Sequence, residues 1–355
     1  MGRRLLVSRS VRAAVIAGAA LYLVPLAGHA QTAVPREAAA AITWTPARTS
    51  WGHPDLQGVW TMDDESSTPF ERPREFGNKA FLTDEEAAKR KERVKLELED
   101  EKAERRAVRG ERYRGNEEGP THWYEKTGAS KRTSQVVDPP DGRLPPMTPE
   151  GQKRLAAIRA MMSTHSEADG PEDRSTYERC INRAKPMIPY GYGNGVQILQ
   201  THESVVLFYE AMHEVRIVPL DGRPHLAKSI RQWNGDPRGH WEGNTLVIDS
   251  TNFTDKQEFA SSAGGSRGQG TPQEAWHLVE RFVPVGPDVI EYQATVSDPV
   301  TWTKPWTLAQ SWRKDPNYRI FEFACHEGNY GLRNILSGAR AADRAAEEAA
   351  KKSGR

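Results

Sequence analysis

Four histidines in the C-terminal half of the chain lie on or beside segments with the pattern of β-strands. Imidazole titrates near neutral pH, so it suits proton transfer, and it is also a common ligand of zinc, copper and iron. Acidic, cationic and phenolic side chains accompany these histidines and would complete an acid/base site. The histidines are His213, His240, His277 and His326, and their companions are Glu280, Arg281, Tyr292, Glu327 and Tyr330.

The period of two along a strand predicts which of these side chains share an interior. In a closed barrel, successive residues of a strand point alternately inward and outward. The more apolar face of residues 277–283 includes Glu280, so we expect Glu280 to point inward and His277 outward. His213 shares its face with two β-branched aliphatic residues, and Glu327 continues the apolar face of a strand expected over residues 319–325. The inward set is therefore predicted to be His213, Glu280, Tyr292 and Glu327.

General acid/base catalysis is the chemistry that this set favours. A buried glutamate with a raised pKa, or a neutral histidine, moves a proton on a ligand held against aromatic walls, and Arg281 neutralises developing negative charge. The polar block 325–331 contains two glycines and is expected to form an active-site loop at a pocket mouth. The predicted catalytic residues are His213, Glu280, Arg281, Tyr292, His326 and Glu327. The predicted ligand-binding residues are His240, Trp241, His277, Asn329 and Tyr330. The structural alternative is that Glu280 and Arg281 pair with other strands while the histidines cap backbone groups.

Three functions remain open from the sequence. The first is a cofactor-free lyase, hydratase or isomerase that acts on a small, partly apolar molecule. The second is a non-catalytic barrel that binds a hydrophobic ligand, and the third is a metal-dependent hydrolase with histidine ligands. The histidines lack the paired spacing of a metal motif, so no metal ligands are assigned. The chain has no phosphate loop, dinucleotide fingerprint or serine nucleophile elbow, so we expect no cofactor and a small molecule as the partner.

The strand pattern predicts a mainly β fold, an antiparallel β-barrel with an N-terminal helical insertion and a short C-terminal helix. Short runs rich in Val, Ile, Phe, Tyr and Trp are separated by Gly, Pro, Asn or Asp, without intervening helices. The Gly58-Val59-Trp60 sequence resembles the opening strand of lipocalin-type barrels, so the barrel is expected to be lipocalin-like. The strands are expected at residues 196–200, 204–209, 213–218, 239–241, 245–249, 277–283, 289–296, 307–312 and 319–325.

The helical insertion is expected at about residues 81–165. Thr83 and Glu86 form a capping box for a charged, solvated helix that runs to about residue 108. Thr148 and Pro149 are the N-cap and first residue of a second helix, which ends near residue 163. The barrel domain is expected to span residues 51–338 as a single domain, with a flexible loop at 264–270 as a candidate lid. Residues 339–355 are expected to form a frayed helical tail.

Residues 1–30 have the pattern of a secretory signal peptide. Basic residues precede an apolar run of about fourteen residues, shorter than the roughly twenty needed to span a bilayer, and a small-x-small site ends at Ala30. General secretory and twin-arginine export both remain open. Residues 31–50 are expected to be a linker, and the product is expected to be periplasmic or secreted. In such a compartment Cys180 and Cys325 are predicted to form a disulfide, with buried free thiols as the alternative.

Charge argues against nucleic acid as a partner. The whole chain has 49 basic and 48 acidic side chains and a formal net charge of +1. The first thirty residues contain four arginines and no acid, so the remaining chain carries about −3, which provides no footprint for a polyanion. No other apolar run reaches the length of a membrane span, and nothing in the sequence fixes an oligomeric state.

Several blocks of the chain resemble a family of uncharacterised exported bacterial proteins. The resemblance extends from about His53 to Arg340 and implies a single exported domain, but it assigns no reaction. The blocks that carry it are PDLQGVW at 54–60, GHWEGNTLVID at 239–249, TNFTD at 251–255, HLVERF at 277–282 and ACHEGNYG at 324–331.

Overall fold

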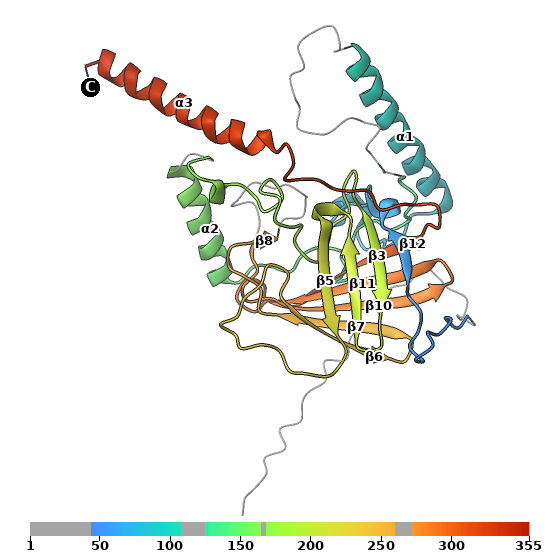
Figure 1. Ribbon diagram of the computed structural model, residues 1–355. Coiled ribbons are helices and arrows are strands. Elements are labelled where there is room, and N and C mark those ends of the chain that lie inside the picture. Colours follow the sequence, from blue (N-terminus) through green and yellow to red (C-terminus); the bar gives the residue numbers. More distant parts are fainter. Residues whose placement is uncertain (1–43, 108–124, 126, 165–167, 260–270, 355) are drawn as a thin grey trace, which may run out of the picture. The chain divides into compact units, whose positions relative to one another are not determined.

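The computed structural model describes residues 44–107, 125, 127–164, 168–259 and 271–354 (Figure 1). These residues all belong to one compact unit. The expected signal peptide, residues 31–43 of the expected linker and the candidate lid at 264–270 lie outside the described residues. Among the helices that the structure describes, none combines the length and apolarity that a membrane crossing requires.

The fold is mainly antiparallel β, built around a nearly closed barrel of nine strands that follow one another in chain order (Figure 1). The first strand pairs with both its successor and the last strand, and this pairing closes one seam of the barrel. At the other seam β5 and β6 approach each other, although no hydrogen-bonded ladder joins them in the described residues. The strands are β1 (Gly58–Thr61), β3 (Gly195–Gln200), β4 (Ser204–Tyr209), β5 (Glu214–Pro219), β6 (Asp236–Glu242), β7 (Thr245–Thr251), β10 (His277–Gly286), β11 (Val289–Ser297) and β12 (Trp306–Lys314).

Shorter elements surround the barrel. Strand β2 (Val136–Asp138) adds to β12, and β8 (Glu258–Phe259) pairs with β9 (Thr271–Pro272) in a separate two-stranded ribbon. The helices are α1 (Asp84–Ala107), α2 (Pro149–Thr164) and α3 (Tyr330–Lys352). Single turns of 3₁₀-helix lie at η1 (Asp63–Glu65), η2 (Arg74–Phe76), η5 (Pro171–Asp173) and η6 (Ala211–His213).

The starts of α1 and α2 confirm the predicted capping. The Glu86 amide donates to Thr83 Oγ1 at 3.3 Å, and the Thr83 amide donates to a Glu86 carboxylate oxygen at 2.8 Å. The Gly151 amide donates to Thr148 Oγ1 at 2.9 Å, and Pro149 is the first residue of α2. Each side chain satisfies an amide that the first helical turn leaves without a partner.

Aromatic residues fill the barrel interior. Tyr292 stacks on Trp312 with 4.8 Å between ring centroids, and Phe282 meets the edge of Trp312 at 5.3 Å. The inward side chains of β11 and β12 have almost no accessible surface, and each large one contributes about 2–3 kcal/mol by burial. This part of the barrel wall is therefore densely packed.

Three expectations about secondary structure are wrong. Residues 319–325 form no strand, because they pair with no strand of the described residues, and β12, which precedes them, is already paired with β11 on one side and with β1 and β2 on the other. Strand β5 begins at Glu214, and His213 lies in η6 outside the sheet. The C-terminal helix begins at Tyr330 rather than 339, because Asn329 Oδ1 accepts the Leu332 amide and caps it.

Candidate active site

Glu280 lies inside the barrel in a salt bridge with Arg216. The guanidinium donates to both carboxylate oxygens, at 3.0 and 2.6 Å, and the Tyr292 hydroxyl donates to Oε1 of Glu280 at 2.7 Å. Arg216 also donates to Ser250 Oγ at 3.2 Å. Glu280 and Tyr292 therefore come together inside the barrel as predicted, and the cation beside them is Arg216 rather than Arg281.

A second buried ion pair lies next to the first. Lys185 Nζ is 2.9 Å from Glu214 Oε1 and 3.9 Å from the centre of the Tyr209 ring. Burial lowers the pKa of Lys185, although the Glu214 carboxylate opposes that shift. Lys185, Glu214, Arg216 and Glu280, which we call the inner network, balance two positive charges against two negative ones.

The inner network is sealed from solvent. Glu280 has 0% and Tyr292 has 2% of its surface exposed. A side chain that borders a water-sized space keeps accessible area, so these residues are packed by protein. A carboxylate that accepts three hydrogen bonds from a guanidinium and a phenol in a sealed core has its acceptor sites filled by the protein and is out of reach of a substrate.

A different set of residues forms a chain of alternating imidazole and carboxylate groups on the outer face of the barrel. His277 Nε2 lies 2.8 Å from Asp249 Oδ2, and the other oxygen of Asp249 lies 3.1 Å from His225 Nε2. His225 Nδ1 in turn lies 3.2 Å from Asp236 Oδ2. We call these four residues the outer chain. The side chain of His277 is 46% exposed, so the chain ends at solvent.

The register of β7 and β10 brings His277 to Asp249. Asp249 pairs with Val279, and His277 lies two residues earlier on the same face of β10. Diagonal neighbours of this kind lie about 7–8 Å apart at the backbone, which long side chains bridge. The outward orientation predicted for His277 is thus confirmed.

His225 reaches Asp249 because its loop is tied to β6 and β7. Asp236 Oδ2 accepts the Leu226 amide at 2.8 Å, and Arg238 donates to the Pro224 carbonyl at 3.1 Å. Asn252, which adopts a left-handed conformation with φ of 59°, donates to the Leu226 carbonyl at 3.0 Å. These bonds fix the backbone on both sides of His225.

The electrostatics of the pair stabilise the carboxylate and make the imidazole more basic. The hydrogen bond that His277 donates to Asp249 raises the pKa of His277, and burial opposes that shift. Burial pushes the pKa of Asp249 upward, but the hydrogen bonds and charges of His277 and His225 outweigh it and the net pKa is lowered. The ring nitrogen of His277 that does not face Asp249, Nδ1, has no hydrogen-bond partner among the described residues, and the side chain is partly exposed.

Two of the remaining predicted residues of the β6–β10 region, Arg281 and His240, lie on the outer face, whereas Trp241 packs against the core. Arg281 donates to Glu242 at 2.5 Å, and His240 lies 3.2 Å from the same carboxylate. Trp241 is half-buried and packs on His53 with 5.5 Å between ring centroids. Arg281 therefore forms the cross-strand pair that was its structural alternative.

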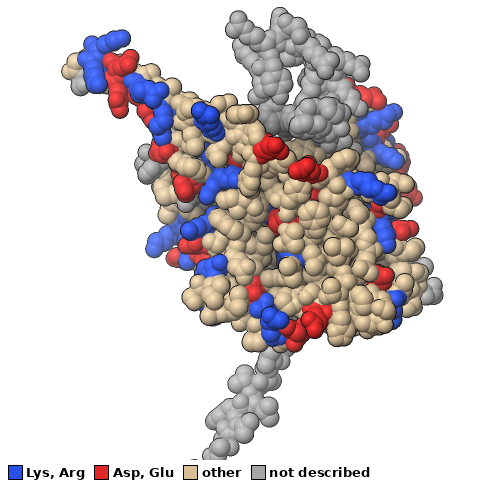
Figure 2. All heavy atoms as spheres, in the orientation of Figure 1, with Lys and Arg blue, Asp and Glu red and all other residues tan. Residues whose placement is uncertain are grey.

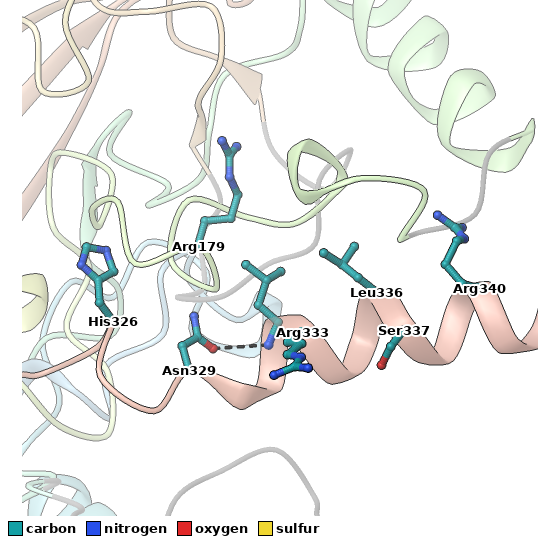
Figure 3. A pocket seen from close by; sticks show the side chains of 8 residues that line it. Arg179, His326, Asn329, Arg333, Leu336, Ser337 and Arg340 are labelled. Carbon is teal, nitrogen blue, oxygen red and sulfur yellow. Dashed lines mark hydrogen bonds between the residues drawn. The ribbon is translucent and has the colours of Figure 1, made fainter.

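The residues predicted at the loop 325–331 lie around the disulfide. Cys180 and Cys325 are bonded, as predicted, across 145 residues. His326 donates to the Cys180 carbonyl at 2.8 Å, Asn329 donates to the Glu178 carbonyl at 3.0 Å, and both line a groove beside α3 (Figure 3). Glu327 and Tyr330 are exposed, so the inward orientation of Glu327 is wrong, because no strand carries it.

The inward orientation of His213 is also wrong. His213 is exposed, and its Nε2 accepts the Phe323 amide at 3.0 Å. Val215 and Ile217 of β5 also face outward, because the alternate positions Glu214 and Arg216 are the buried ones. The pattern of apolar residues indicated the opposite face, since it treats an arginine as a solvent residue.

Six residues of these two clusters were not predicted, and two of them, Lys185 and Glu214, form the second buried ion pair. Arg216 looked solvent-exposed, and His225, Asp236 and Asp249 lie in a loop and two strands with no spacing that links them. The period of two does place Asp249 opposite the buried Ile248, and this is the one local signal that could have found it.

No metal centre is formed here: among the described residues, no group of three or more His, Cys, Asp or Glu side chains could hold a metal ion. Comparison of the chain with protein-family models, with curated proteins and with solved structures found no match.

Proposed function

We propose that this protein is an enzyme that uses His277 as a general acid/base, with Asp249 as the residue that positions it. The observation that carries the proposal is the outer chain, in which one carboxylate bonds two imidazoles and the outermost imidazole reaches solvent. An imidazole held by a carboxylate has a fixed ring orientation and a fixed tautomer, which general acid/base catalysis requires. The second imidazole, His225, is itself held by Asp236.

The reaction class is proton abstraction and return, as in a lyase, hydratase or isomerase. Neutral His277 takes a proton from a carbon of the substrate at Nδ1, and the electron pair of that carbon–hydrogen bond moves into the substrate. The imidazolium that forms is stabilised by Asp249, and it returns the proton to another atom of the substrate or to its leaving group. This cycle balances protons and needs no further reactant in an isomerase, while a hydratase or lyase adds or releases water or the leaving group.

The proposed substrate is a small, partly apolar molecule bound on the outer face. Leu226 and Ile230 are both exposed on the loop that carries His225. They provide apolar contact beside the imidazoles. Glu280 and Tyr292 are buried, so a substrate binds on the outer face and not in the barrel interior.

We also propose that the barrel is lipocalin-like and that the protein works outside the cytoplasm. The chain-order arrangement of the strands and the buried Trp60 on β1, 3% exposed, support the first statement. The disulfide and the signal-like pattern of residues 1–30 support the second.

The experiment is solvent deuterium exchange. The purified protein is incubated in deuterium oxide with hydroxy acids, unsaturated acids and ketones that carry apolar groups, and mass spectrometry follows deuterium uptake and turnover. The His277→Gln variant should lose about 10²–10⁴-fold of the rate, the range that general acid/base groups contribute.

The matched control is His240→Gln, which removes another exposed histidine paired with a carboxylate on the same face. The control should keep the wild-type rate. Equal rates in the wild type and His277→Gln, or loss in the control alone, would contradict the proposal.

A further inference from the structure

The outer face of β3, β4 and β5 is an apolar surface exposed to solvent. Leu199, Val215 and Ile217 are 44%, 51% and 62% exposed. Val206 pairs across the strands with both Leu199 and Ile217, and Phe208 pairs with Val215, so the five side chains are contiguous. We call them the sheet patch. Figure 2 shows that few charged side chains interrupt the surface over these strands.

The inner network explains why these residues face outward. The inward positions of β5 belong to Glu214 and Arg216, which are held by Lys185 and Glu280. The period of two then places Val215 and Ile217 on the outside. Contiguous apolar surface of this kind marks an interface in soluble proteins, because covering it is favourable by about 25 cal/mol per Å².

Helix α3 has a second incompletely covered apolar surface. Residues at helical spacing form a stripe along it, and the helix has no buried residue. Ile335 is 38% exposed, while Leu332 and Leu336 line an open groove of about 580 Å³ against Arg179 (Figure 3). The residues of the stripe are Leu332, Ile335, Leu336, Ala339, Ala342 and Ala346.

We propose that the sheet patch binds the apolar stripe of α3 from a second copy of this chain. Each copy has one helix stripe and one sheet patch, so a twofold exchange covers both surfaces in both copies. The charge at the edges of the two surfaces and their dimensions favour a second copy as the partner.

Charge at the edges of the two surfaces agrees with this pairing. Glu203 is exposed in the turn between β3 and β4, at one end of the sheet patch. Glu322 is exposed beside Phe323, whose amide reaches His213 at the other end. Helix α3 has five basic and three acidic residues, so its net charge is positive. The exposed Arg333 and Arg344 provide partners for the two glutamates.

The size of the contact fits a dimer. Three strands spaced ~4.8 Å apart, each six residues at ~3.3 Å, give a surface of roughly 14 by 20 Å. About 13 residues of helix cover 20 Å at ~1.5 Å per residue, which corresponds to the segment 332–344. Counting both sides of two such contacts, the dimer buries on the order of 1,100 Å², which exceeds the ~1,000 Å² expected of a biological interface and is just below the ~1,200 Å² at which stable interfaces begin.

The test measures oligomeric state by sedimentation over a range of protein concentrations. The wild-type protein should dimerise, and Ile217→Asp and Ile335→Asp should each weaken the dimer more than about a hundredfold, because each buries a carboxylate in both contacts. Leu96→Asp is the matched control. It changes another exposed aliphatic residue, on α1 outside both surfaces, and should leave the dimer unchanged.

A mixture of the two variants distinguishes helix exchange from other packing. One copy then keeps its helix and the other keeps its sheet patch, so one of the two contacts is intact, and association should be intermediate between wild type and either variant alone. A monomeric wild type would overturn the proposal. A dimer that survives Ile335→Asp would show sheet-to-sheet packing. A dimer that survives Ile217→Asp would show helix-to-helix packing. Either result overturns helix exchange. Circular dichroism verifies that both variants remain folded. The readout is independent of the role proposed for His277.

Discussion

Strands β7 and β10 carry charged pairs on both faces, and the pair on the inner face is buried while the pair on the outer face is partly exposed. Ser250 points inward to Arg216 of the inner network, while the adjacent Asp249 points outward to the outer chain. Glu280 and His277 lie three residues apart on β10, one sealed and the other half exposed. The two residues differ in their access to water. The inner charges are held by buried protein partners, whereas the outer ones can exchange protons with solvent or a ligand.

A titratable residue is therefore not catalytic merely because it lies inside a barrel. A sealed ion pair costs desolvation free energy and must keep all its partners, so it specifies packing. A pair at the surface keeps its orientation and its ability to titrate.

Removing Glu280 should cause the largest loss of stability. Glu280→Ala leaves the Arg216 guanidinium buried without its carboxylate, and breaking such a pair costs about 3–5 kcal/mol. Denaturant unfolding of the variant measures the loss. Glu242→Ala, which breaks the exposed pair with Arg281, should cost about 1 kcal/mol or less. Similar losses of unfolding free energy in the two variants would contradict the claim that the buried pair is the more costly one to break.

Replacing both partners of the inner pair should restore much of this stability. In Arg216→Met/Glu280→Leu no buried charge lacks a partner, and apolar replacement of a buried ion pair is often neutral or stabilising by about 1–4 kcal/mol. The free energy of unfolding of the double variant should therefore exceed that of Glu280→Ala. A double variant less stable than the single one would mean that the pair contributes more than the desolvation it costs.

Asp63 provides an intermediate case, because it is only partly sealed. Burial raises the pKa of Asp63 to about 6, while a hydrogen bond from Asn194 opposes the shift. The folded protein binds this proton more tightly than the unfolded chain, so stability falls as pH rises from about 4 to about 6, by on the order of 1–2 kcal/mol after solvent screening. Unfolding measured across this range, with Asp63→Asn as the variant, should show a flatter profile in the variant. An unchanged profile would exclude Asp63 as its source.

Asp249→Asn should have the smallest effect on stability and a clear effect on titration. The pair is half exposed, so the variant should lose less than about 1 kcal/mol. Loss of the carboxylate should lower the pKa of His277, which NMR titration of the imidazole measures. Because the folded pKa of His277 is raised, the stability from this pair is fully present below about pH 6.5 and is lost as pH rises through the folded pKa. A His277 titration that does not change would show that Asp249 does not control it.

Local patterns determined most of the secondary structure. Eight of the nine predicted strands, the two capped helices and the β6–β7 hairpin followed from short-range alternation, capping residues and the Gly243 turn, each of which is a property of a few neighbouring residues. The strand expected at 319–325 is absent although its local pattern is that of a strand, because a strand also needs a pairing partner and these residues have none among the described strands. The pairing of Cys180 with Cys325 followed from their number and the expected compartment.

The sequence by itself determined the barrel class, the disulfide and the inward position of Glu280, because each depends on residue type and period. Only the tertiary structure decided that Arg216 is buried, since an arginine enters a core when a distant strand supplies its carboxylate. The same holds for the outer chain, whose four residues come from a loop and three strands and meet only through register. Charge pairing across the barrel thus turns Glu214 and Arg216 of β5 inward, where the sequence pattern predicted the aliphatic residues. The candidate chemistry lies on the outer surface.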